Sequence, residues 1–281
     1  MIQTNVNLYE HFGFPKGENA RGFLVCQALE PIPAVTSSRR RPAVLILPGG
    51  GYANTSLREA EPIALHFLTR GYATFTLFYT VKPQGFPVSL REAAMAMRYI
   101  RENADAFDVE PTMVAAMGFS AGGHLCGTLG TMYDCPEVAD IGNAGMVRPD
   151  ALGLCYPVLV EWGPTHQGTF ENISMGDPEL RKRLSLEARV RPDMPPVFLW
   201  HTRTDAGVPC RNSIIMAQAL DEAGVDFTLH VYCKGPHGLS TADTLTYATY
   251  NLPEVSRDVR SWLPAMMDFF EDVGFRVVDM P

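Results

Sequence analysis

The sequence predicts an α/β protein in which helices cover both faces of a mostly parallel central sheet. Three observations predict this fold class. Short apolar segments alternate with helical patterns along most of the chain, which is typical of parallel sheets. Most of these segments are continuously apolar, as strands buried on both faces are. The chain has 281 residues, 46% of them hydrophobic, which is enough for one large core.

The apolar segments predict six strands, over residues 43–47, 73–79, 113–119, 151–156, 197–201 and 227–232. Residues 1–41 lack this alternation, and we expect them to form an N-terminal edge segment. Within it, residues 23–29 are the best candidate for an antiparallel strand at one edge of the sheet. We expect one domain over residues 1–281, because single α/β domains often reach this length.

The spacing of apolar residues predicts helices over residues 60–68, 90–100 and 212–223, and from about residue 261. Ser89 followed by Glu92 has the spacing of a capping box, which would begin the second helix. Gly224 is expected to end the third, since glycine readily adopts a left-handed conformation. Pro62 leaves the start of the first helix open.

Residues 159–196 break this alternation, because they are rich in proline, glycine and charged residues. We expect them to form a small, polar, cap-like excursion above the ends of the strands. A separate domain is not indicated.

The formal net charge is −8, and no run of Lys and Arg is longer than residues 39–41. Nucleic acids and anionic membrane surfaces are therefore disfavoured as partners, because both require clustered basic residues. No apolar run is long enough to span a bilayer, and residues 1–10 do not have the pattern of a signal peptide.

The six cysteines are scattered, and none forms a C-x-x-C pair. Four lie in or beside apolar runs, where a free cysteine behaves as a small hydrophobic residue. Free buried thiols are therefore favoured over disulfides or metal ligands, and a cytoplasmic location is expected.

A G-x-S-x-G pattern surrounds Ser120, at the end of one predicted strand and the start of a helical segment. The flanking glycines, Gly118 and Gly122, permit a cramped turn that projects the serine hydroxyl outward, so Ser120 is predicted to be a nucleophile. The alternative is a glycine-rich turn with an incidental serine.

The segment PGGGY, residues 48–52, follows another predicted strand. Its glycine amides, together with the amide of Ala121, could stabilise the oxyanion formed in acyl transfer. We predict Gly50 and Gly51 as donors, with Gly51 favoured. A phosphate-binding loop is the rival, but its G-x-x-x-x-G-K-[ST] or G-x-G-x-x-G pattern is absent. A simple turn is the other alternative.

His237 lies in the segment GPHG, just after the last predicted strand. A rigid turn there suits a base that must reach the serine, so His237 is predicted to be the general base. The other histidines fit less well: His201 and His230 lie in predicted strands, His66 and His124 in helical segments, and His11 and His166 in irregular segments.

Asp205 follows the predicted strand 197–201 and best satisfies the order serine, acid, histidine. Its carboxylate would fix the tautomer of the base and stabilise its protonated form. The weaker rivals are Asp177, Asp193 and Asp226.

The segments PGGGY, GFSAGGHL, PPVFLWHTRTDAGVP and KGPHGLS resemble the acetyl esterases and acetyl-xylan-esterase-like enzymes of the α/β-hydrolase superfamily, over about residues 40–275. The resemblance implies the α/β-hydrolase fold and the same assignment of nucleophile, acid, base and amide donors. Pro48 stands where the lipase-like H-G-G-G motif has histidine, which argues against the hormone-sensitive-lipase branch. Kynurenine formamidase-like enzymes have a similar glycine loop and S-A-G-x-H motif and are the nearest alternative.

The sequence therefore predicts a serine carboxylesterase that acts on short acyl esters, above all acetylated carbohydrates such as xylo-oligosaccharides. No cofactor or metal ion is expected. Tyr52 and Trp162 are candidates for contacting a sugar ring, the alternative being that both belong to the core. An amidase, formamidase or peptidase on the same residues remains open, and a non-catalytic binding protein is a third possibility.

Overall fold

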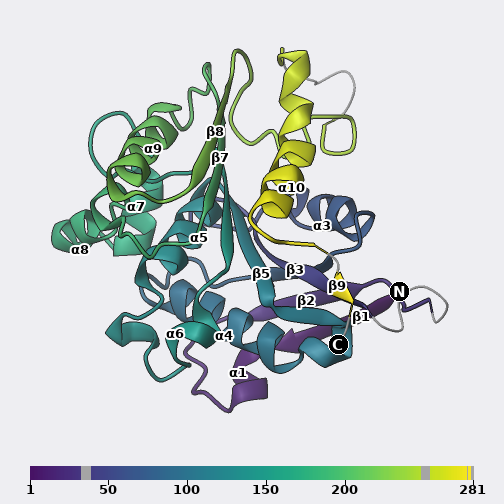
Figure 1. Ribbon diagram of the computed structural model, residues 1–281. Helices are drawn as coiled ribbons and strands as arrows, with labels where there is room; N and C mark the ends of the chain where they lie inside the picture. Colours follow the sequence, from purple (N-terminus) through teal and green to yellow (C-terminus); the bar gives the residue numbers. More distant parts are fainter. Residues whose placement is uncertain (33–38, 248–253, 277, 280–281) are drawn as a thin grey trace.

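The computed structural model describes residues 1–32, 39–247, 254–276 and 278–279. Eight strands form one sheet in the order β1-β2-β4-β3-β5-β6-β7-β8 (Figure 1). They are β1 (Ile2–Asn7), β2 (Phe23–Ala28), β3 (Arg39–Leu47), β4 (Ala73–Phe78), β5 (Val109–Phe119), β6 (Ala151–Cys155), β7 (Val197–Thr202) and β8 (Phe227–Tyr232). A two-residue strand, β9 (Val278–Asp279), pairs antiparallel with the start of β3.

All neighbouring strands from β4 to β8 are parallel, whereas β2 pairs antiparallel with both β1 and β4. The predicted fold class is therefore confirmed. The predicted antiparallel strand is present as β2, but it lies one strand in from the edge, which β1 forms. The predicted strands are all present, although β3 and β5 each begin four residues earlier than expected.

Helices cover both faces of the sheet, as Figure 1 shows. On one face lie α3 (Glu61–Leu68) and α10 (Trp262–Asp272), and on the other α4 (Val88–Glu102), α5 (Ala121–Met132) and α9 (Arg211–Ala223). The shorter helices are α1 (Leu8–Phe12), α6 (Ala144–Val147), α7 (Gln167–Ser174) and α8 (Pro178–Arg183). Short 3₁₀ turns include η1 (Leu57–Glu59), η4 (Glu187–Arg189) and η6 (Arg257–Ser261).

Strand β5 explains why the central strands are continuously apolar. Val114 and Ala116 pack in the core beneath α4 and α5, while Ala115 and Met117 pack in the second core beneath α3 and α10. Successive side chains of a strand point to opposite faces, so a strand between two helical layers needs apolar residues at every position.

Two predicted helix ends agree with the structure, and the structure places the start of α3, which the sequence left open. Helix α9 ends at Gly224, which has a φ of 70°, and α10 begins directly after Ser261. Helix α3 begins at Glu61, with Pro62 in its first turn, where the missing N–H costs nothing.

The predicted capping box is wrong. Helix α4 begins after Pro87, and Ser89 and Glu92 lie inside it without capping its end. Glu92 is buried and accepts hydrogen bonds from the backbone and hydroxyl of Thr80 and from the hydroxyl of Tyr9. Its carboxylate therefore ties the helix to the segment after β4 and is not available to the helix terminus.

The excursion over residues 159–196 contains α7, α8 and η4 and follows the carboxyl end of β6. Its role as a cap, and the single domain over residues 1–281, stay predictions. The cysteines are free thiols as predicted, and Cys26, Cys126, Cys155 and Cys210 are buried.

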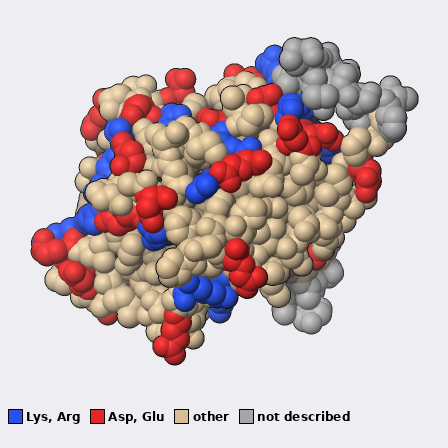
Figure 2. Space-filling view, turned by 90° about the horizontal axis from the view of Figure 1, so that it is seen from below, with Lys and Arg blue, Asp and Glu red and all other residues tan. Residues whose placement is uncertain are grey.

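Within the part of the chain that the structure describes, no helix is both long and apolar enough to cross a membrane. On the face shown in Figure 2, basic side chains lie close to acidic ones. The structure pairs Arg91 with Asp140 at 2.6 Å and Arg191 with Asp134 at 2.8 Å.

Candidate active site

Ser120 lies in a sharp turn between β5 and α5, with φ 54° and ψ −116°. A methyl group at Gly118 would overlap the backbone of Gly122, and one at Gly122 would overlap the carbonyl of Leu47. The Ser120 amide donates to the carbonyl of Cys155 at 3.0 Å. Flanking glycines and backbone hydrogen bonds thus hold the serine in a conformation that few side chains adopt.

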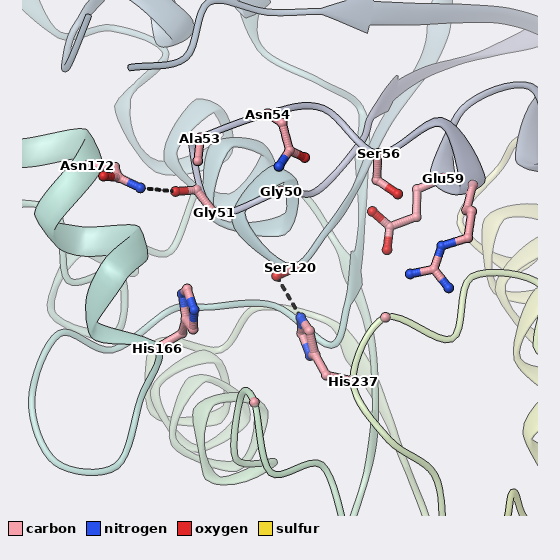
Figure 3. A pocket seen from close by; sticks show the side chains of 13 residues that line it. Gly50, Gly51, Ala53, Asn54, Ser56, Glu59, Ser120, His166, Asn172 and His237 are labelled. Atoms are coloured by element: carbon pink, nitrogen blue, oxygen red, sulfur yellow. Dashed lines mark hydrogen bonds between the residues drawn. The ribbon is translucent and has the colours of Figure 1, made fainter. Parts of the chain in front are cut away.

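The structure brings Ser120, His237 and Asp205 together from three different loops. The Nε2 atom of His237 lies 2.8 Å from the hydroxyl of Ser120, as Figure 3 shows. Its Nδ1 atom lies 2.7 Å from a carboxylate oxygen of Asp205. Because β5, β7 and β8 are parallel, the loops after their carboxyl ends meet at one edge of the sheet.

Asp205 is fixed by its own loop. Its second carboxylate oxygen accepts hydrogen bonds from the amides of Gly207 and Val208, at 2.9 and 2.8 Å. Burial opposes its ionisation, but His201, His237 and the Val208 amide more than offset that effect, so the pKa of Asp205 lies well below its ordinary value. A carboxylate that remains ionised can stabilise a protonated His237.

The glycine loop after β3 faces the same serine. Gly50 has a φ of 132°, and a Cβ there would overlap Asn54, so only glycine fits. In the described part of the chain, the amides of Gly50, Gly51 and Ala121 donate to no protein acceptor. Free backbone donors beside a nucleophile are what an oxyanion hole requires.

A cavity of about 430 Å³ opens in front of Ser120. It is lined by Ser120, His237, Gly50 and Gly51 among others (Figure 3). Ala121, at the start of α5, is fully buried and is not among the lining residues. The serine itself is only 8% exposed, so a substrate must enter this cavity to reach the hydroxyl.

The prediction that Tyr52 contacts substrate is wrong. Its side chain is 1% exposed, and its hydroxyl lies 2.9 Å from Nδ1 of His124 inside the core. The residue has a φ of 54°, and its ring packs in the core edge-on to the rings of Tyr79 and His124. Trp162 is 47% exposed, but it does not line the cavity and instead donates to Glu187 at 2.7 Å.

Sequence reasoning missed Glu59, which lies in η1 at the cavity wall. It is 3% exposed and accepts hydrogen bonds from the amide of Gly49 at 2.8 Å and from the hydroxyl of Tyr156 at 2.6 Å. Burial raises the pKa of Glu59, and these hydrogen bonds partly oppose the rise. Tyr156 also accepts from the amide of Ser240, so Glu59 connects the glycine loop to the loop that carries His237.

The excursion contributes two further cavity residues, His166 and Asn172. Asn172 donates from its side-chain amide to the carbonyl of Gly51 at 2.8 Å, which fastens the glycine loop to α7 (Figure 3). The polarity of the excursion predicts a polar wall, but no local pattern distinguishes these two residues from their neighbours.

Among the described residues, no three His, Cys, Asp or Glu side chains are grouped so as to hold a metal ion. The groups at this site can attack a carbonyl carbon, transfer a proton and stabilise an oxyanion, which together are the requirements of acyl transfer.

Two family profiles match the chain: BD-FAE over residues 32–145 and the prolyl oligopeptidase family over residues 90–252. The endo-1,4-beta-xylanase B of Butyrivibrio fibrisolvens is 34% identical over 78% of this chain and 36% of that protein. The acetylxylan esterase of Xylanibacter ruminicola is 27% identical over 80% of this chain and 45% of that protein. The chain thus spans between a third and a half of the length of these relatives.

Solved structures match over almost their whole length. The acetyl ester-xyloside bifunctional hydrolase of Caldicellulosiruptor lactoaceticus is 33% identical, with a TM-score of 0.76 over 90% of this chain and 88% of that one. MGS-M1, an alpha/beta hydrolase enzyme from a deep-sea metagenome library, is 31% identical, with a TM-score of 0.76 over 97% and 98% of the two chains.

Proposed function

This chain belongs to the prolyl oligopeptidase family by its profile and to the acetyl-esterase and acetyl-xylan-esterase-like enzymes of the α/β-hydrolase superfamily, and we propose that it removes acetyl groups from carbohydrates through an acyl-enzyme on Ser120. It is an ester-hydrolysing enzyme. The observation that carries the mechanism is the continuous chain of hydrogen bonds from Ser120 through His237 to Asp205.

In the first half of the reaction, the Ser120 oxygen bonds to the ester carbonyl carbon while Nε2 of His237 takes the hydroxyl proton. The carbonyl oxygen becomes an oxyanion, which the amides of Gly50, Gly51 and Ala121 stabilise. When this intermediate collapses, the bond to the alcohol oxygen breaks and His237 returns the proton to the departing alcohol.

In the second half, water replaces the serine hydroxyl as the nucleophile. His237 takes a proton from the water as the water oxygen bonds to the acyl carbon. It then returns this proton to the Ser120 oxygen as the carboxylic acid leaves. Asp205 stays ionised throughout and stabilises the imidazolium of His237, in keeping with its lowered pKa.

The carbohydrate part of the proposal is supported by the cavity and by the relatives. Polar side chains surround the entrance to Ser120, namely Asn54, Ser56, Arg58, His166 and Asn172. Sugar hydroxyls can exchange hydrogen bonds with such groups, whereas the alkyl group of a plain alkyl ester cannot. The names of the relatives include an acetylxylan esterase and a xylanase.

Ester cleavage is favoured over cleavage of a glycosidic bond, although one similar structure is of a bifunctional hydrolase. Glycosidases use a pair of carboxyl groups that flank the bond. Among the described residues that line the cavity, Glu59 is the sole carboxylate, and both of its oxygens are hydrogen bonded. We therefore expect no cleavage of 4-nitrophenyl β-xyloside.

Amide cleavage is the second candidate, since the prolyl oligopeptidase family matches more than half of the chain. The deciding experiment measures acetate release from acetylated xylobiose and xylotriose. In parallel it measures hydrolysis of N-formylkynurenine, a feruloyl ester and a peptide amide. The acetylated sugars should have the highest kcat/KM. A higher value for the formamide or the peptide, with the sugars near background, would contradict the proposal.

A further inference from the structure

His166 stands at the wall of the cavity, on the loop that leads into α7. Its Nδ1 atom accepts a hydrogen bond from the backbone amide of Thr169 at 3.2 Å and lies 2.8 Å from the hydroxyl of the same residue. The same amide also donates to the backbone carbonyl of His166 at 3.1 Å. Because a backbone amide can only donate, its hydrogen beside Nδ1 favours the tautomer in which Nδ1 is unprotonated and the neutral ring carries its proton on Nε2.

That Nε2–H has no hydrogen-bond partner among the described residues, whereas both nitrogens of His237 are engaged. Figure 3 shows His166 and His237 in the same cavity, with the dashed line joining His237 and not His166 to Ser120. The ring also lies against the glycine loop, since a methyl group at Gly51 would be 3.6 Å from its Cε1 atom. His166 is therefore an oriented donor in the wall of the cavity that Ser120 also lines.

The chemistry of His166 suits a hydrogen-bond donor and not a second general base. Because Nε2 already carries the proton and Nδ1 faces Thr169, the ring presents no free lone pair to the cavity. Burial, and next the nearby His237, lower the pKa of His166, which keeps the ring neutral. A fixed neutral donor recognises an oxygen atom, such as a hydroxyl or a ring oxygen.

This inference rests on the proposed function. We propose that His166 determines specificity by donating a hydrogen bond to the sugar that carries the scissile acetyl group. The acceptor is a hydroxyl or the ring oxygen of that sugar. Thr169, which is fully buried, acts as a positioning residue that holds the ring in the donating tautomer. Selection of sugar esters over plain alkyl esters would then depend on this one donor.

The test compares two acetates of similar ring size, methyl 4-O-acetyl-β-xyloside and cyclohexyl acetate, which lacks hydroxyls and a ring oxygen. His166→Phe should lower kcat/KM for the xyloside roughly three- to tenfold, as expected for one neutral hydrogen bond, and change that for cyclohexyl acetate less than twofold. His166→Gln, which keeps an N–H, should lose less than His166→Phe.

Two further variants sharpen the result. His66→Phe, on α3 outside the cavity, controls for the loss of a histidine and should leave both substrates unchanged. Thr169→Val should cause a smaller loss for the xyloside alone. Combined with His166→Phe it should add nothing, because both changes remove the same interaction.

The outcomes separate this inference from the function on which it rests. If the wild type prefers the xyloside and His166→Phe keeps that preference, the function stands and the inference is overturned. Equal losses on both acetates would also overturn it, because they indicate general damage. If the wild type hydrolyses both acetates alike, the carbohydrate proposal and the inference fail together.

Discussion

At the scale of single residues, the proposed chemistry depends on three side chains that act as one unit. Ser120→Ala should fold normally, because the backbone hydrogen bonds of the turn do not involve the hydroxyl. It should lower kcat by roughly 10⁴ to 10⁶. His237→Ala should lose a similar amount, and the double variant no more than either single one. Retention of a tenth of the wild-type esterase activity by Ser120→Ala would refute the mechanism.

Glu59 gives a second test at this scale, through the pH dependence of stability. Its folded pKa is raised, so between the unfolded value of about 4.3 and the folded value the native protein holds a proton that the unfolded chain has released. Stability should therefore fall as pH rises through this window, by at most about 1.4 kcal/mol per pH unit.

The measurement is urea unfolding from pH 5 upward for the wild type and Glu59→Gln. The difference between their unfolding free energies should change with pH in the stated direction, since glutamine does not titrate. Asp205 affects stability in the opposite direction, because its pKa is lowered in the folded protein. Its contribution to the free energy of unfolding is complete above about pH 4. A constant difference across the range would show that Glu59 does not titrate there.

At the scale of structural elements, α7 holds the proposed oxyanion hole in place. Asn172 on α7 donates to the carbonyl of Gly51, whose amide is a proposed oxyanion donor. Asn172→Ala should lower kcat for all esters alike, by roughly tenfold, because a loosened donor loses part of the stabilisation that a whole donor provides. Glu171→Ala, at the exposed neighbouring position, is the matched control. A change confined to sugar substrates would assign Asn172 to substrate binding.

Most strands, and the turn that carries Ser120, could be predicted from the sequence. The central strands β3, β5 and β6 were predictable because burial on two faces favours a continuous run of apolar residues. Strand β8, at the edge of the sheet, is only partly buried and was predictable from its β-branched and aromatic residues. The turn around Ser120 was predictable because only glycines leave room for the close backbone contacts within it. The positions of Ser120, His237 and Asp205 follow from those elements, although their catalytic roles stay predictions.

The remainder depends on contacts between segments that are distant in the sequence. Glu92 has the spacing of a capping residue, yet Thr80 and Tyr9 engage it. Tyr52 follows the glycine loop, yet the loop's turn buries it against His124. Nothing near Glu59 in the sequence indicates Tyr156 as its partner, and nothing near His166 indicates that it lines the cavity, because both relations exist only in the folded chain.

At the scale of the whole molecule, the size of the cavity limits the length of the acyl group that the enzyme accepts. It measures about 430 Å³ and must hold both the acyl group and part of the alcohol. A long acyl chain gains about 0.8 kcal/mol per methylene only where apolar walls bury it. The excursion that borders this cavity contributes His166 and Asn172, which are polar.

Short acyl groups should therefore be preferred. We expect 4-nitrophenyl acetate and propionate to exceed the octanoate in kcat/KM by at least about tenfold, since the long chain gains nothing from burial here and competes with the alcohol for the space in the cavity. The measurement is a series of 4-nitrophenyl esters from two to twelve carbons at one pH, with Ser120→Ala as the blank. A maximum at eight carbons or beyond would require a long apolar channel, and the residues that line this cavity do not provide one.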